Sequence, residues 1–154
     1  MNKLLSKLRE RRATGEKGFT LIELLVVVVI IGVLIAIAVP LYLNYRKGAN
    51  DAASQSDLRN SISVLELCAN DNNGKYPPDG EFKLSSGGGN AGKCERTIAL
   101  SDGTTLVYRG IKEGVSYTVT SMNDSGSDKV FCYSSAQGGQ VEATGSGLGA
   151  EACK

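Results

Sequence analysis

The side chains of this 154-residue chain offer disulfide chemistry more readily than catalysis or metal binding, because there are four cysteines and no histidine. Histidine is the commonest general base and the commonest metal ligand in proteins. The sequence contains neither a G-x-S-x-G segment nor a C-x-x-C pair, and its carboxylates are scattered. We therefore expect no enzymatic activity, no cofactor and no bound metal.

One carboxylate stands out because of its surroundings. Glu23 immediately precedes sixteen residues without a polar side chain, Leu24–Val39. A carboxylate left unpaired in lipid is costly, so such residues usually have a partner. Thr20 to Glu23 fits the S/T-x-x-E capping box of a helix start. If the chain were cut after Gly18, the new amine of Phe19 would offer an ionic partner instead, within one chain or between chains.

The apolar run is long enough to cross a membrane. As a helix, the segment from Phe19 to Tyr45 reaches about 40 Å, against about 30 Å for a bilayer core. Residues 1–18 carry a net charge of +4, which by the positive-inside rule keeps that end in the cytoplasm. Three fates follow for this segment: a secretory signal peptide cut after Ala38, an uncut anchor, or a chain processed between Gly18 and Phe19.

Residues 17–24, Lys-Gly-Phe-Thr-Leu-Ile-Glu-Leu, lie between a basic leader and the apolar run, and this arrangement resembles the type IV prepilin signature. The resemblance implies removal of residues 1–18 by a prepilin peptidase, N-methylation of Phe19 and polymerisation into a fibre. It further implies that Glu23 pairs with the N-terminal amine of a neighbouring subunit. Pro40 matches a proline that many type IV pilins have at this place, where the helix bends.

The remainder of the chain predicts an α+β fold. An amphipathic pattern continues the helix to about Asn70, where a turn-rich segment and Pro77-Pro78 end it. Residues 77–92 are expected to form a loop. Four strands are expected after this loop: Thr97–Leu100, Thr105–Arg109, a half-buried Val115–Ser121 and Lys129–Tyr133, with Gln140–Ala143 as a candidate fifth strand. The first two flank Asp102-Gly103, which is typical of a hairpin turn. We expect a long N-terminal helix, apolar in its first half and amphipathic in its second, packed on a four-stranded antiparallel sheet, the pilin-like roll that the family also implies.

Disulfides are expected on the translocated side of the membrane, where all four cysteines lie. Three connectivities are possible. We favour Cys68–Cys94, which would clamp the helix end to the following loop, and Cys132–Cys153, which would hold the C-terminal tail. The second pair resembles the C-terminal disulfide loop of many pilins.

The sequence thus predicts three parts: a removed leader (1–18), a transmembrane and fibre-core helix (19–45) and a head (46–154) with a disulfide-bonded C-terminal region. The expected protein waits in the cytoplasmic membrane with its N-terminus inside, and then self-assembles into an extracellular pilus filament that supports motility, adhesion or DNA uptake. Its expected partners are the prepilin peptidase, the pilus assembly machinery and, before assembly, membrane lipid. A net charge of +1 gives no support for nucleic-acid binding.

Two alternatives stay open. A pseudopilin of a type II secretion or competence system would share the N-terminal signature. A secreted binding domain would instead begin after Ala38. Glu23 distinguishes the secreted domain from the prepilin and pseudopilin alternatives. A carboxylate is unfavourable in the apolar region of a signal peptide, whereas the resemblance to prepilins implies that it is required.

Overall fold

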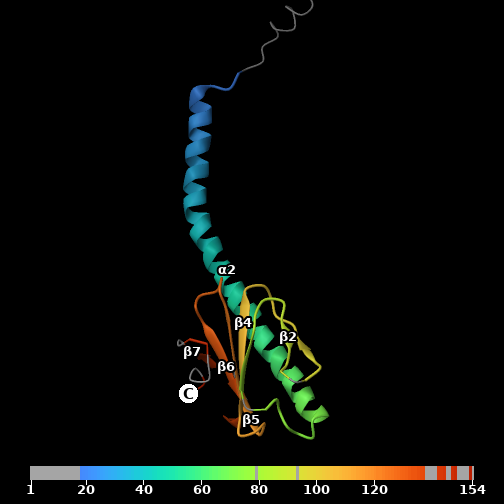
Figure 1. Cartoon of the computed structure of the whole chain (residues 1–154). Helices are drawn as coiled ribbons and strands as arrows, with labels where there is room; N and C mark the ends of the chain where they lie inside the picture. The colour runs from blue at the N-terminus through green and yellow to red at the C-terminus, as the bar shows by residue number, and fades with distance from the viewer. Residues whose placement is uncertain are drawn as a thin grey trace, which may run out of the picture. The chain divides into compact units, whose positions relative to one another are not determined.

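The computed structural model describes residues 18–78, 80–92, 94–137, 142–144, 147–148 and 153. One helix, α2 (Leu21–Asp71), precedes all the strands. The described residues divide into two compact units between Leu41 and Tyr42. We call residues 18–41 the apolar unit and the described residues from Tyr42 onward the head unit. Figure 1 shows α2 and the strands of the head unit.

The two ends of α2 follow from local chemistry. Thr20 stands directly before the first helical residue and caps the first turn, as described below. At the other end, the backbone N–H of Asn72 donates to the carbonyl of Cys68 and that of Gly74 to the carbonyl of Ala69. Asn73 and Gly74 adopt positive φ angles of 55° and 78°, the left-handed conformation that stops helices. The prediction that the helix ends near Asn70 is confirmed.

The main sheet is antiparallel throughout, with the strand order β1-β4-β5-β6-β7. Its strands are β1 (Gly80–Leu84), β4 (Thr104–Ile111), β5 (Ser116–Asn123), β6 (Val130–Ser134) and β7 (Glu142–Thr144). A separate two-stranded sheet pairs β2 (Gly89–Asn90) with β3 (Thr97–Ile98), and a short 3-10 helix, η1 (Ser135–Gln137), follows β6. The predicted α+β class is confirmed, with four longer strands and the candidate fifth strand present as β7.

The expected hairpin about Asp102-Gly103 is wrong, although the turn itself exists. Thr97–Ile98 pairs with β2 rather than with β4, and β1 takes the place beside β4. Residues 77–92, expected to be a loop, therefore contain β1 and β2. Pairing of Phe82 with Tyr108 depends on a contact between segments far apart in sequence, which local turn patterns do not encode.

The core of the head unit lies between α2 and one face of the main sheet (Figure 1). Leu58 and Leu65 on the helix are fully buried. They belong to one cluster with the inward-facing residues of the sheet, Leu106, Tyr108, Tyr117, Val119 and Phe131. Burying large apolar side chains in this way is the dominant favourable contribution to folding. The sheet and the second half of the helix therefore form one folded body.

Strand β5 differs from the expected half-buried strand. Tyr117 and Val119 face the core, but Thr118 and Thr120, which point to the other face, are buried as well. The strand lies at the centre of the sheet, between β4 and β6. The alternation of apolar and polar residues correctly predicts the side of β5 that faces the helix. It does not predict that the side chains on the opposite side are buried as well.

Candidate functional site

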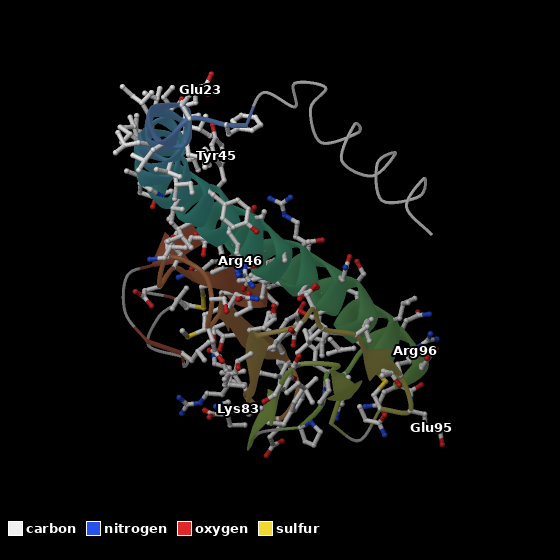
Figure 2. The ribbon with its side chains drawn as sticks, turned by 90° about the horizontal axis from the view of Figure 1, so that it is seen from above. Glu23, Tyr45, Arg46, Lys83, Glu95 and Arg96 are labelled. Atoms are coloured by element: carbon white, nitrogen blue, oxygen red, sulfur yellow. A yellow bond between two sulfur atoms is a disulfide. The ribbon has the colours of Figure 1, made fainter. Side chains whose placement is uncertain are left out.

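Thr20 and Glu23 form a reciprocal capping box at the start of α2. The backbone N–H and the hydroxyl of Thr20 each donate a hydrogen bond to Oε2 of Glu23, both at 2.8 Å. In return, the backbone N–H of Glu23 donates to Oγ1 of Thr20 at 3.3 Å. These bonds satisfy polar groups that a helix N-terminus otherwise leaves without partners. Figure 2 shows Glu23 at this end of the helix, exposed to solvent.

Gly18 and Phe19 precede the cap and are exposed, with Phe19 at 82% of its full accessible area. A Cβ atom built on Gly18 would meet no other atom within 4 Å. The fold of the described residues therefore places no steric demand for glycine at position 18. Any requirement for glycine there comes from another molecule that approaches this bond.

The apolar unit buries none of its apolar side chains. Its large side chains from Leu21 to Val39 are between 47% and 81% exposed. Helix α2 is the one described helix long and apolar enough to cross a membrane, with a mean hydropathy of 3.3 in its most apolar window. An apolar surface of this size needs a cover of lipid or protein.

Pro40 lies inside α2, and the helix continues through it. Proline has no backbone N–H, so the carbonyl of Ala36 loses its usual helical partner. The division between the apolar unit and the head unit falls one residue later, between Leu41 and Tyr42. Pro40 thus stands next to the boundary between the two units, while the first buried side chain of the helix is that of Asp51.

Both favoured cysteine pairs are disulfides in the structure. Cys68–Cys94 joins the last turns of α2 to the segment before β3, with a Cα–Cα distance of 5.9 Å. Cys132–Cys153 joins β6 to the C-terminal region, with a Cα–Cα distance of 5.5 Å. None of the described cysteines is free. Among the described residues, no group of three or more Cys, Asp or Glu side chains could hold a metal ion.

Two carboxylates in the head-unit part of α2, Asp51 and Asp57, are buried. Asp57 accepts hydrogen bonds from the backbone N–H of Ser101 at 2.7 Å and from its hydroxyl at 3.1 Å. Asp51 accepts from the backbone N–H of Ser127 at 2.9 Å and from its hydroxyl, and Lys129 lies 3.8 Å from it. These hydrogen bonds hold two loops against α2. The one sign of this burial in the sequence is the helical spacing of Asp51 and Asp57 with other residues that turn out to be buried, Ser54, Leu58 and Ser61.

Glu66 joins two tyrosines near the end of α2. The phenol of Tyr76 donates to Oε2 of Glu66 at 2.9 Å, and that of Tyr117 donates to Oε1 at 3.1 Å. Burial, the hydrogen bond to Glu66 and its charge raise the pKa of Tyr76 from 10.0 to about 12. Burial and the charge of Glu66 also raise the pKa of Tyr117 well above its usual value. The two phenols stay protonated and anchor segment 75–78 to the core.

The sequence around the capping box and the apolar unit is similar to that of known proteins. Residues 14–39 match the prokaryotic N-terminal methylation motif. The type IV wide pilus major component PilA4 of Thermus thermophilus is 46% identical over 57 residues, which are 37% of this chain and 44% of PilA4. The matched part of this chain thus spans less than half the length of that relative. No solved structure matches the chain.

Two further relatives match over more of their length. The type IV narrow pilus major component PilA5 of Thermus thermophilus is 38% identical over 94 residues, covering 59% of this chain and 76% of PilA5. The type IV major pilin protein PilE1 of Neisseria gonorrhoeae is 31% identical over 132 residues, covering 77% of this chain and 76% of PilE1. These two matches extend well beyond the N-terminal motif into the head unit. The chain belongs to the type IV pilin family.

Proposed function

We propose that this chain is a structural subunit of a type IV pilus, made as a prepilin, cut after Gly18 and polymerised from Phe19 onward. The single observation that carries the proposal is the fully exposed apolar unit with an exposed carboxylate, Glu23, in its first helical turn. A helix of this kind is stable only in lipid or among other apolar helices. Both environments occur in the life of a pilin.

Before assembly, the apolar helix spans the cytoplasmic membrane. The basic leader keeps the N-terminus in the cytoplasm, and the head unit with its disulfides lies outside. The prepilin peptidase removes residues 1–18, and methylation of Phe19 follows. The exposure of Gly18 and Phe19 supports this step, because the described part of the chain does not cover the bond between them.

During assembly, the apolar helices leave the lipid and pack together as the core of a filament. Lipid is as apolar as the helices, so the transfer itself gains little and polar contacts fix the arrangement. We assign this role to Glu23 and the amine of Phe19 on a neighbouring copy. Pro40 weakens the helix next to the boundary of the two units and lets the head adjust as the copies pack.

The capping box does not compete with this role. Thr20 binds Oε2 of Glu23 in the isolated chain, and a carboxylate has two oxygens with about four acceptor positions. A second donor can therefore reach Glu23 while the cap persists. The geometry of the first turn supports a carboxylate that is oriented by its own chain and neutralised by another.

The experiment that tests the proposal combines shearing with electron microscopy of cells that express the wild type and Glu23→Ala. We expect filaments containing the wild type in the sheared fraction. We expect Glu23→Ala to be inserted and cut but absent from filaments. Normal filament yield from Glu23→Ala would contradict the role of Glu23, and a wild type that forms only a short periplasmic assembly would favour the pseudopilin alternative.

A further inference from the structure

The start of the head unit presents an unpartnered face with two aromatic rings and a positive charge. Tyr42, Tyr45 and Arg46 have the spacing i, i+3 and i+4, which places them on one side of α2. Tyr42 is 64% exposed and Tyr45 is 72% exposed. Lys47, the next residue, is exposed as well but lies on the opposite side of the helix from Tyr45, outside this face. We call Tyr42, Tyr45 and Arg46 the neck face.

The positive charges of Arg46 and Lys47 form no ion pair within the described part of the chain. The two ion pairs found among the described residues are Arg96–Asp71 and Lys129–Asp51. Asp51 lies one turn after Lys47, the usual spacing for a helical ion pair. It is turned instead toward Ser127 and Lys129. Arg46 and Lys47 therefore remain exposed.

A cavity of 570 Å³ lies at the opposite end of the head unit, where α2 ends. Its apolar part is formed by Tyr76, Pro77 and Pro78, beside the Cys68–Cys94 disulfide. Among the described residues, its charged lining consists of three acidic side chains, Asp71, Glu95 and Glu113, and two basic ones, Lys75 and Arg96. Arg96 pairs with Asp71 at 2.7 Å, and the described side chains of the lining carry one more negative than positive charge.

The helix itself adds to this negative character. The last turn of α2 carries no basic side chain, and a helix C-terminus bears a partial negative charge. Figure 2 shows Glu95 and Arg96 together near this end of the helix, with Tyr45 and Arg46 toward the other end of the head unit. The cavity therefore favours a positively charged group accompanied by apolar surface.

We propose that this cavity receives the neck face of a second copy of the chain. The proposal rests on the proposed function, since it describes a contact between subunits of one filament. Copies inserted in the membrane with the same orientation assemble in parallel. A contact between parallel copies is head to tail, uses two different surfaces and produces an open helical fibre.

The positions of the two surfaces fit this arrangement. Lys47 and Asp71 are 24 residues apart in one continuous helix, which corresponds to about 36 Å. A parallel copy displaced by about that length along the head-unit part of α2 brings its neck face level with the cavity of the first copy. Tyr42 and Tyr45 then meet Tyr76, Pro77 and Pro78, while Arg46 meets the acidic lining that includes Glu95 and Lys47 lies at the edge of the contact.

Zero-length carbodiimide cross-linking of purified filaments tests the contact without any substitution. We expect mass spectrometry to find an amide bond, with loss of one water, between Lys47 and Glu95 or another carboxylate of the cavity. The helix holds these groups far apart within one chain, so such a bond joins two copies. It should be absent from detergent-solubilised monomer. Filaments in which Lys47 links only to carboxylates outside the cavity would overturn the proposal.

Charge reversal provides the second test. We expect Arg46→Glu to lower filament yield several-fold and Arg46→Glu with Glu95→Arg to restore it. Lys83→Glu is the matched control, because Lys83 is exposed on β1, outside both surfaces, and changes the net charge equally. Loss of the membrane-inserted form of Arg46→Glu, rather than of its filaments, would assign the positive charges to lipid head groups and overturn the proposal.

These tests separate the two proposals. A wild type that never enters a filament refutes the proposed function itself. Wild-type filaments without the Lys47 cross-link, or an Arg46→Glu variant that assembles as well as Lys83→Glu, refute only the contact between neck face and cavity.

Discussion

Oε2 of Glu23 accepts two hydrogen bonds from Thr20, one from the backbone N–H and one from the hydroxyl, both at 2.8 Å. The residue to which we assign the intersubunit ion pair is therefore also the residue that caps the helix. Two substitutions separate these roles. Glutamine at position 23 retains the capping box and loses the charge, whereas valine at position 20 loses the hydroxyl and leaves the charge.

We expect Glu23→Gln to be inserted and cut, but to assemble much less than Thr20→Val. The reason is that an amide cannot neutralise the amine of Phe19 on a neighbouring copy. Filament yield in the sheared fraction, relative to processed protein in the membrane, measures the difference. Equal yields for Glu23→Gln and the wild type would show that capping alone accounts for the carboxylate.

Substitutions of Gly18 should block processing without changing the fold. A Cβ at this position meets no atom of the chain within 4 Å, so any loss of cleavage reflects the fit of the peptidase. We expect Gly18→Ala to slow cleavage and Gly18→Val to abolish it, as seen from the size of the membrane-bound protein. Complete processing of both variants would remove the peptidase from this account.

The disulfide at the end of α2 should contribute much of the stability of the head unit. Cys68 and Cys94 are separated by 26 residues, and closing a loop of this size is worth about 3 kcal/mol. We expect Cys68→Ala with Cys94→Ala to lower the free energy of unfolding by about that amount. Chemical denaturation of oxidised variant and wild type measures it. An unchanged unfolding midpoint would contradict the prediction.

Buried Asp57 should matter more than exposed Asp71. Asp57→Ala leaves the backbone N–H of Ser101 without its acceptor and should destabilise the head unit by about 1–3 kcal/mol. Asp71→Ala removes the exposed ion pair with Arg96 and should cost less than about 1 kcal/mol. Thermal unfolding of the two variants gives the comparison, and a larger effect of Asp71→Ala would contradict it.

Much of the fold could be predicted because its signals are local. Thr20 and Glu23 mark the helix start, the turn-rich residues after Asp71 mark its end, and the alternation of Tyr117 and Val119 marks the core face of β5. Strand β1 could not be predicted in this way. Its residues lie between prolines and a glycine-rich segment, and they become a strand only by pairing with β4, as Phe82 does with Tyr108.

The same distinction applies to the candidate sites. Gly18, Phe19 and Glu23 form a continuous motif that the sequence displays directly. Asp57 reaches Ser101 across 44 positions in the sequence, and Tyr117 reaches Glu66 across 51. A buried carboxylate on a helix looks like any other polar residue until the partner that satisfies it is known.

Alkaline pH should destabilise the head unit. The pKa of Tyr76 rises from 10.0 in the unfolded chain to about 12 in the folded one. Between these two pKa values, the folded head keeps a proton that the unfolded chain loses. The contribution of Tyr76 to the free energy of unfolding is therefore fully present below pH 10.0 and is lost as the pH rises toward about 12. Melting temperatures determined by circular dichroism at a series of pH values measure this effect.

The matched variant for the alkaline prediction is Tyr76→Phe with Tyr117→Phe. It removes both phenols that donate to Glu66. We expect it to be less stable at neutral pH because two hydrogen bonds are lost, but to lose less stability between pH 10 and pH 12 than the wild type. An equally steep loss in both proteins would assign the alkaline effect to other groups.

Intact mass and N-terminal sequencing of the membrane and sheared surface fractions test the central claim most directly. We predict that the mature chain begins at methylated Phe19, and that its mass is lower by two hydrogens for each of the disulfides Cys68–Cys94 and Cys132–Cys153. A chain beginning at Val39 would instead be a secreted domain without the apolar unit, and would contradict the filament account.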